Sequence, residues 1–494
     1  MARVSSVLFD YPRWMQGLDR PHDTSLEVDT EGEPQPGDLT PTFWTTEETG
    51  HQITSGNGEN ITWTFSGPVQ YGQYANDDYF VVAPAGVTIT HIDPLSVEEY
   101  YSTTFPDWVR NGSMLNPVAS QGNGYDRYPE TYGSNPYNAA SNVGRPGGSD
   151  LSAANPLVIA PGNSLVSTRS RNTPNNRQQL LDAAVLTVVS EVPVANSFRP
   201  PYPGTDKPSW TTGDIDWSKL QAKQVARSRL SSLPSPTVPD SIKRVFLDHN
   251  GRTVWYRITP ANHGRTYGRD VAKRFGDAAL RLLLDFPQND IEEYVISFIQ
   301  IGIDIAAMAE SGQTWPNNGG IYHGRKIAVM FAAWLLNAPD MAAVGIPPDS
   351  FIFMEDQQTN FVTQSMVDNH NYPSEMLGWP EWNIRFASWL GYPNTIHDGN
   401  LAPNPSWGST YRNMNTSIAG PVLAATIAGL SETWAWPALF EYIDRCYNAR
   451  TEGPGNDPMG THGDWAVKTN GITQLTLDMW DEFRSDYSAH WTRP

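Results

Sequence analysis

The chain has 494 residues, which is enough for two or three domains. Its 53 acidic and 33 basic residues give a formal net charge of −20. Such a charge excludes indiscriminate binding to nucleic acid or to an anionic membrane, and no run of Lys or Arg offsets it. Forty Gly and forty Pro predict many turns and long loops.

The first residues lack the apolar stretch of a secretory signal, because Asp10, Arg13 and Asp19 interrupt it. No later segment approaches the length of a membrane-spanning helix. We therefore expect a cytoplasmic protein, or one that is extracellular after lysis, as a virion-associated product would be. The single cysteine, Cys446, lies in an apolar helical stripe, and we expect it to be a buried thiol.

From about residue 40 to 200, apolar and polar residues alternate with the period of a β-strand. Short strands separated by Gly, Pro and Asn are typical of sandwiches. We predict an antiparallel β-sandwich-like domain over residues 1–200, with its clearest strands at 61–65, 79–82, 87–91, 157–159 and 185–189.

Prolines are dense after this region, as in Phe198-Arg199-Pro200-Pro201 and over residues 231–239. Proline at this density stiffens and extends a connection. We therefore predict a Pro-rich linker over residues 201–240.

After residue 265 the apolar spacing becomes that of helices. Several stripes are wide and almost wholly apolar, which favours inner helices packed between others. We predict an all-α, (α/α) toroid-like domain over residues 241–494, with helices at 271–282, 291–299, 327–335, 419–430, 433–449 and 473–487. The fold class is thus α+β multidomain, with the β-domain first.

The periodicity fades between residues 338 and 415, a segment that holds four tryptophans and two histidines. Long loops without regular structure commonly line a binding site. Polar residues also gather just before the predicted helices, where Asn, His, Tyr and Arg recur together. If these helix starts face one side of a toroid, their side chains converge on one cleft.

This combination of residues suits β-elimination at a uronic acid, in which the substrate carboxylate is neutralised, a base removes the C5 proton and an acid protonates the departing oxygen. The scheme needs no metal and no cofactor. Asn262 or Asn318 would neutralise the carboxylate together with Arg325. The base would be His263 or His323, and the acid Tyr322 or Tyr411.

Further basic and aromatic residues would bind the polymer, since a chain of charge −20 can hold a polyanionic sugar only where guanidinium groups are concentrated. Arginines at helix starts supply such a place. The expected substrate-binding residues are Arg265, Tyr267, Lys326, His370, Tyr372, Trp379, Trp382, Trp407 and Arg412.

Two other functions remain open. A glycoside hydrolase acting on a marine polysaccharide would need a pair of carboxylates. The candidates for such a pair are Glu355, Asp356, Asp368, Glu375, Glu381 and Asp398. A non-catalytic carbohydrate-binding or virion-associated structural protein would use the same Trp-rich loops. No HExxH motif is present, so a zinc site is not expected. The sequence also has no G-x-S-x-G motif and no P-loop.

The helical half resembles the toroid-type polysaccharide lyases of the alginate lyase and heparinase type. The resemblance rests on Asn262-His263 with Tyr267, on Tyr322-His323-Gly324-Arg325 and on Tyr411-Arg412. In many such lyases the helical domain precedes the β-domain, and here the order is reversed. Residues 318–326 and 434–445 are also similar to an uncharacterised group of marine bacterial proteins, a similarity that spans roughly residues 60–490. The leading expectation is therefore a lyase acting on an acidic polysaccharide.

Overall fold

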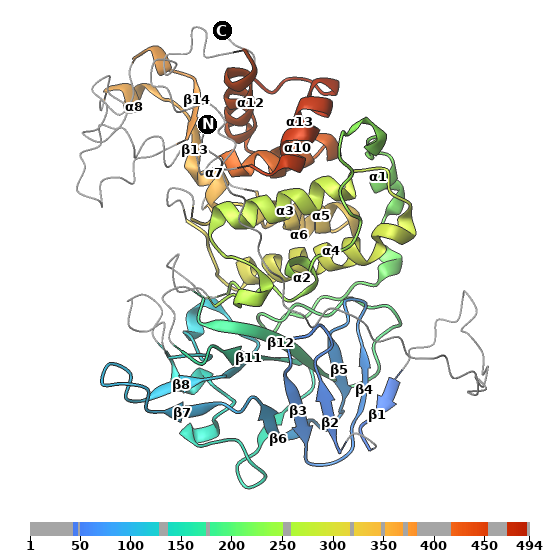
Figure 1. The fold of residues 1–494 in the computed structure, drawn as a ribbon, viewed down its shortest axis with the longest axis vertical. Helices are drawn as coiled ribbons and strands as arrows, with labels where there is room; N and C mark the ends of the chain where they lie inside the picture. Colours follow the sequence, from blue (N-terminus) through green and yellow to red (C-terminus); the bar gives the residue numbers. More distant parts are fainter. Residues whose placement is uncertain are drawn as a thin grey trace, which may run out of the picture. The chain divides into compact units, whose positions relative to one another are not determined.

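The computed structural model describes residues 43–47, 50–127, 137–173, 178–249, 258–316, 321–346, 351–368, 374–382, 416–452 and 472–491. Residues 41–494 form one compact unit. Within this unit a β-rich region comes first in the chain and a helical region follows (Figure 1). The α+β, two-part architecture expected from the sequence is therefore confirmed.

A six-stranded sheet forms the middle layer of the unit. Its neighbouring strands are antiparallel except for β5 and β12, which are parallel. The sheet is therefore mixed, which corrects the antiparallel prediction. The long chain between β5 and β12 supplies the crossover that a parallel pair requires. In spatial order the strands are β1 (Phe43–Thr45), β4 (Gln70–Gln73), β5 (Tyr79–Val82), β12 (Leu180–Val189), β11 (Asn163–Ser170) and β9 (Ser113–Leu115).

A four-stranded antiparallel sheet packs against one face of the larger sheet. Its spatial order is β10 (Leu157–Ile159), β6 (Val87–Asp93), β3 (Thr62–Phe65) and β2 (Gln52–Thr54). Trp63 and Ile89 of this sheet share a core with Leu165 and Leu186 of the larger sheet. The two sheets thus form a sandwich, and the predicted strands are confirmed. A separate hairpin joins β7 (Val97–Glu99) to β8 (Trp108–Arg110).

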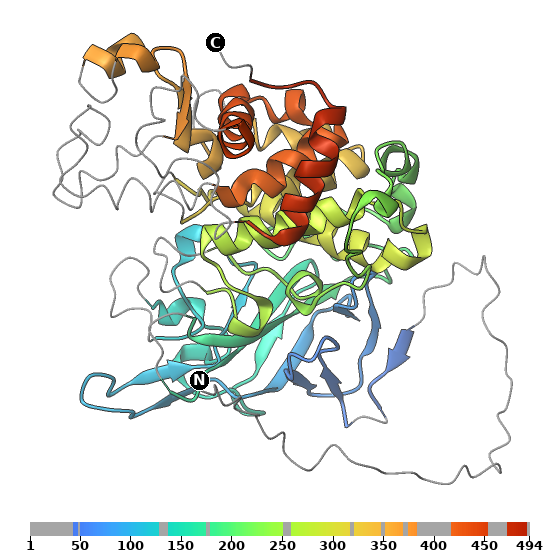
Figure 2. The ribbon, with the colours of Figure 1, turned by 45° about the horizontal axis from the view of Figure 1, so that its top comes forward.

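Strand β12 shows why the helices cover the other face of the larger sheet. Ala184, Leu186 and Val188 belong to the sandwich core, whereas Ala183 and Val185 belong to the core that the helices share. Because alternate side chains of a strand point to opposite faces, β12 is apolar on both faces and is buried between two layers. Figures 1 and 2 show the helices over that face.

All six predicted helical stripes are helices. They are α3 (Gly268–Leu282), α4 (Gln288–Glu310), α5 (Lys326–Leu335), α10 (Ala419–Ala428), α12 (Pro437–Glu452) and α13 (Gln474–Phe483). Helix α4 is buried along residues 294–309, where Asp304 is the one charged residue. Short elements before and between these helices are α1 (Trp217–Gln221), α2 (Asp240–Lys243), α6 (Pro339–Ala343), α7 (Met354–Gln358), α8 (Gln364–Asp368), α11 (Ser431–Trp434) and a hairpin of β13 (Thr359–Phe361) and β14 (Pro380–Trp382).

Residues 201–240 are not an extended linker. Tyr202 and Leu220 are fully buried in the core that the sheet shares with the helices. The Arg199 guanidinium, also fully buried, lies 2.5 Å from Asp78 and 2.6 Å from Asp304 of α4. The prolines therefore shape a packed segment that fastens the β-rich region to the helices.

None of the helices in the described ranges is long and apolar enough to cross a membrane. Cys446 of α12 is buried, as the sequence predicts.

Candidate functional site at the helix starts

Polar segments that precede different helices in the sequence lie together in the structure. The Gly268 backbone N–H, at the start of α3, donates to the Ile321 carbonyl at 2.6 Å. Ser417, just before α10, contacts His323, just before α5. We call residues 264–268, 321–326, 354–356 and 416–418 the helix-start junction.

His323 is fully buried in this junction. Its Nε2 lies 2.6 Å from the Ser417 hydroxyl oxygen, and its ring meets Trp382 edge to face with centroids 5.9 Å apart. Gly324 has a φ of +95°, and a Cβ there would lie 2.3 Å from the Cα of Ala272 on α3. Glycine therefore permits the close approach to α3 that positions His323.

Two adjacent carboxyl groups and one ammonium group are buried in the same junction. Lys326 Nζ lies 2.6 Å from Asp356 Oδ2 and donates to the Trp434 carbonyl at 2.7 Å. Glu355 Oε1 accepts hydrogen bonds from the backbone N–H groups of Gly324 at 3.3 Å and Lys326 at 3.2 Å. Glu355 thus satisfies two donors at the start of α5 that no carbonyl of the helix can reach.

Burial, with the charge of the neighbouring Asp356 as the next cause, raises the pKa of Glu355 to about 7. The Oε2 atom of Glu355 is sealed from solvent and has no hydrogen-bond partner among the described residues. With a proton on Glu355, the charges of Glu355, Asp356 and Lys326 sum to zero. The cluster then avoids the cost of burying an uncompensated charge.

Arg325 is fully buried, unlike the surface guanidinium expected at this helix start. Its Nε lies 2.8 Å from Asp248 Oδ2, and its Nη1 donates to the carbonyls of Tyr322 at 2.9 Å and His323 at 3.1 Å. Its charge is neutralised within the fold, and so is that of Lys326. We therefore do not retain these two residues as ligands of a substrate carboxylate.

The first turns of α3 carry a local excess of positive charge. Arg265 is exposed, and the Arg269 guanidinium lies 5.6 Å from the centroid of the Tyr267 ring. Asp270 is 3.4 Å from Arg269. Burial lowers the pKa of Lys273, and the Arg269 charge lowers it further.

Arg274, next to Lys273 on α3, also has a lowered pKa. Burial lowers its pKa to about 10, with the charge of Arg325 as the next cause. Its Nη1 donates to the His263 carbonyl at 2.9 Å. Its Nε and Nη2 are sealed from solvent without a hydrogen-bond partner in the described chain. Arg265, Arg269, Lys273 and Arg274 therefore gather positive charge around the start of α3, with Asp270 as their nearest acid in sequence, within a chain of charge −20.

His263 is bound into the contact between β12 and the segment before α3. Its Nδ1 lies 2.9 Å from the Val245 carbonyl oxygen, and its Nε2 accepts the Ala183 backbone N–H at 3.4 Å. Burial lowers its pKa to about 3. Asn262 donates to the Asp182 carboxylate at 3.0 Å. Both ring nitrogens of His263 serve the fold, so we do not retain it as a base.

The remaining expected residues differ in exposure. Tyr322 and Trp382 are buried, so neither presents a face to a polymer in this arrangement. Trp379 is half-buried, with the Arg445 guanidinium 5.1 Å from its ring centroid. Six expected residues lie outside the described residues, namely Asn318, His370, Tyr372, Trp407, Tyr411 and Arg412.

Sequence reasoning missed Ser417 and Asp248, the partners of His323 and Arg325. Ser417 lies between Thr416 and Ile418 without a motif around it, and Asp248 lies in no apolar stripe. Their importance comes from contacts with residues 94 and 77 positions away. No local pattern carries that information.

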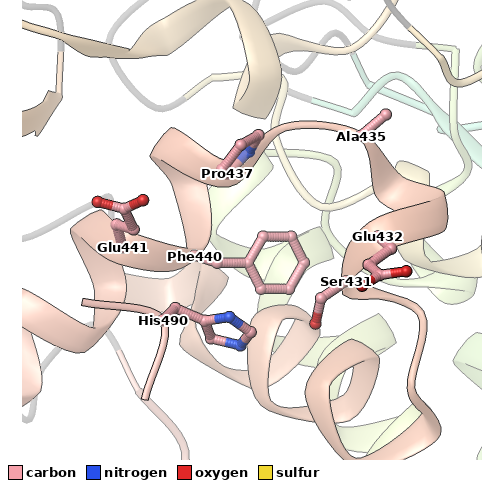
Figure 3. Close-up of a pocket in the computed structure, with 7 residues that line it drawn as sticks. All are labelled: Ser431, Glu432, Ala435, Pro437, Phe440, Glu441 and His490. Carbon is pink, nitrogen blue, oxygen red and sulfur yellow. The ribbon is translucent and has the colours of Figure 1, made fainter. Parts of the chain in front are cut away.

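A cavity of about 390 Å³ lies elsewhere in the helical region, and none of the expected site residues lines it. Figure 3 shows Phe440 and His490 between its two carboxylates, Glu432 and Glu441, which lie on opposite sides of the cavity. His490 Nε2 lies 3.0 Å from the Thr426 hydroxyl. The two carboxylates do not converge as a catalytic pair requires.

Among the expected hydrolase carboxylates, Glu381 is buried and lies 3.1 Å from Arg445. Glu355 and Asp356 are buried within the junction. Asp398 lies outside the described residues. Asp368 and Glu375 are exposed.

No group of three or more His, Cys, Asp or Glu side chains suited to a metal ion occurs in the described part of the chain. No protein-family model, curated protein or solved structure matches this chain.

Proposed function

We propose that this protein is a polysaccharide lyase that cleaves an acidic, uronic-acid-containing polysaccharide by metal-independent β-elimination. The observation that carries the proposal is the pair of guanidinium groups, Arg265 and Arg269, at the start of α3, which contacts the segment that holds the buried ring of His323. The net charge of −20 repels a polyanion over the molecule as a whole. A local group of guanidinium side chains therefore determines where such a polymer docks.

In this proposal Arg265 and Arg269 bind the substrate carboxylates, since a guanidinium matches a carboxylate in geometry and charge. Neutralising the carboxylate makes the C5 proton more acidic. His323 accepts that proton, and the Ser417 hydroxyl holds its ring in position. Tyr411 stays the predicted acid for the departing oxygen.

His323 is covered in the described arrangement, so proton abstraction requires a covering side chain to move. Trp382 is the ring that packs on it, and its indole N–H has no hydrogen-bond partner among the described residues. Displacing Trp382 would therefore break no hydrogen bond of that N–H group.

We also propose that the helices form a toroid-like arrangement, as in the lyases that the helical half resembles. The starts of α3, α5 and α10 meet at one place, which supports this arrangement. The acidic polymer is the proposed partner, and the protein meets it in the cytoplasm or after release by lysis.

The test is incubation with alginate, glucuronan and other polyuronates while ultraviolet absorbance reports the unsaturated product. We expect the double variant R265A/R269A to raise KM about tenfold or more, by loss of two charge-assisted contacts. The double variant R227A/R229A removes the same charge from a half-buried and an exposed position that pair with Asp285, Glu482 and Asp486. It should leave KM unchanged.

Two outcomes would contradict the proposal. New reducing ends without ultraviolet absorbance would identify a hydrolase. Binding of the polymer without any cleavage would identify a carbohydrate-binding or structural protein.

A further inference from the structure

Three aromatic side chains form a row across the outer strands of the six-stranded sheet. We call Trp44 of β1, Tyr71 of β4 and Tyr79 of β5 the aromatic strip. The ring centroids of Trp44 and Tyr71 are 5.5 Å apart, and those of Tyr71 and Tyr79 are 5.8 Å apart. Trp44 is 41% exposed, which is unusual for the largest apolar side chain.

The pairing of the strands explains why the three rings share one face. Trp44 is directly opposite Tyr71, and Tyr71 is directly opposite Val81. Val81 is fully buried in the sandwich core, and Tyr71 and Tyr79 pack against that core. The aromatic strip therefore continues the apolar inner face of the larger sheet out to solvent.

The core also holds the rings in place. Tyr71 and Tyr79 are partly buried against it, and the Tyr71 ring contacts those of both Trp44 and Tyr79. Rings fixed on strands lose little conformational freedom when a ligand packs on them, so contact with them contributes more fully to affinity. Aromatic side chains of this kind commonly dominate the energy of an interface.

The polar groups beside the strip indicate which ligand suits it. Burial raises the pKa of Tyr79, and the neighbouring Tyr71 and the charge of Asp77 contribute to the increase, so Asp77 lies close to the strip. Lys243 lies 3.1 Å from Asp77, and the Gln73 amide donates to the Asp77 carbonyl at 3.2 Å. Carboxylate, phenol and amide groups here suit a ligand rich in hydroxyls.

We propose that the aromatic strip binds an uncharged polysaccharide. The C–H faces of pyranose rings pack against the electron-rich faces of aromatic rings, and sugar hydroxyls bond to neighbouring polar groups. A row of rings suits a chain of repeating units better than a single small molecule. Charge disfavours polyanions, because Lys243, the cation beside Asp77, is already paired with Asp77 and Glu293 in a chain of net charge −20.

This binding surface is independent of the helix-start junction. It would hold the protein on a neutral glycan while the junction acts on an acidic polymer nearby. Loss of either activity would leave the other in place.

The test is native electrophoresis of the full chain in gels that contain xylan, dextran, laminarin or alginate. We expect at least one neutral polysaccharide to retard the protein. Substitutions in the strip should not change migration in alginate, because alginate does not bind this surface. W44A should weaken the interaction by about tenfold, as the loss of one well-packed aromatic contact does. Y100A is the control, since Tyr100 is 67% exposed and lies outside the strip.

Retardation by none of the neutral polysaccharides would overturn the proposal, as would equal effects of W44A and Y100A. Light scattering tests whether a second copy of the chain, rather than a polysaccharide, occupies the strip. A dimer that W44A dissociates would show that a second copy of the chain covers the strip, and would also overturn the proposal.

Discussion

Glu355 and Glu59 are carboxyl groups whose pKa burial raises to about 7. The same groups have an ordinary pKa of 4.5, so the folded chain holds their protons more tightly between pH 4.5 and pH 7. Their contribution to stability is therefore fully present below pH 4.5 and is lost as the pH rises through 7. For an individual residue such as Glu355, burial rather than residue type therefore determines whether the side chain in the junction is charged.

The variant E355Q should remove one part of this pH dependence. Raising the pKa of one carboxyl from 4.5 to about 7 corresponds to about 3 kcal/mol of unfolding free energy across that range. We expect E355Q to gain by a similar amount relative to the natural chain when urea unfolding at pH 8 is compared with pH 5. E375Q, at an exposed position, should show no such gain. Equal pH dependence of E355Q and the natural chain would contradict the assignment.

The contact between α3 and the segment before α5 depends on one glycine. Gly324 and Gly378 both have positive φ, +95° and +82°, but a Cβ at Gly378 would meet nothing within 4 Å. Comparing the stability of alanine variants at the two positions therefore separates the cost of the backbone conformation from the cost of the contact with α3.

We expect G378A to cost about 1–2 kcal/mol, the usual strain of a non-glycine residue in this conformation. G324A should cost distinctly more, because its Cβ would overlap Ala272 of α3 and push the segment away. Denaturant unfolding of both variants measures the difference. Equal costs would show that the close approach at Gly324 does not matter.

At the scale of elements, periodicity predicted well what local sequence controls. The alternation of apolar and polar residues over 87–91 correctly predicted strand β6, and the apolar stripe over 327–335 correctly predicted helix α5. The segment 201–240 was misjudged, because its prolines indicated an extended chain whereas distant partners such as Asp304 decide its packing. The parallel pairing of β5 with β12 likewise depends on contacts between distant residues.

The candidate site was predictable in part. The sequence placed His323 and Arg325 in one polar group before a helix, and the structure brings that group to the starts of α3 and α10. Their residue types did not reveal that Arg325 is neutralised by Asp248 inside the fold. Burial and partners of a polar side chain depend on the whole fold, so they could not be read from spacing alone.

At the scale of the whole molecule, the β-rich and helical regions share one core between the six-stranded sheet and the helices. Arg199 reinforces this contact, since Asp78 precedes β5 and Asp304 belongs to α4. We therefore expect the two regions to unfold together rather than in separate steps.

The variant R199M should destabilise the chain by about 3–5 kcal/mol, because it leaves the buried carboxylate of Asp304 and the partly buried one of Asp78 without their cation. Far-ultraviolet circular dichroism and tryptophan fluorescence should follow one shared transition in both proteins. R229A is the control, since its ion pairs are exposed to solvent and should contribute little to stability. Two separate transitions in the natural chain would contradict the shared core.

The most direct test of the account is the initial rate of unsaturated-uronate formation by the natural chain, H323Q and H263Q. A lyase that uses His323 as its base should lose about 10²-fold or more of its kcat in H323Q. H263Q should keep its kcat per folded molecule and lose only stability, since both ring nitrogens of His263 serve the fold. Undiminished absorbance with H323Q, or its loss in H263Q alone, would contradict the central claim.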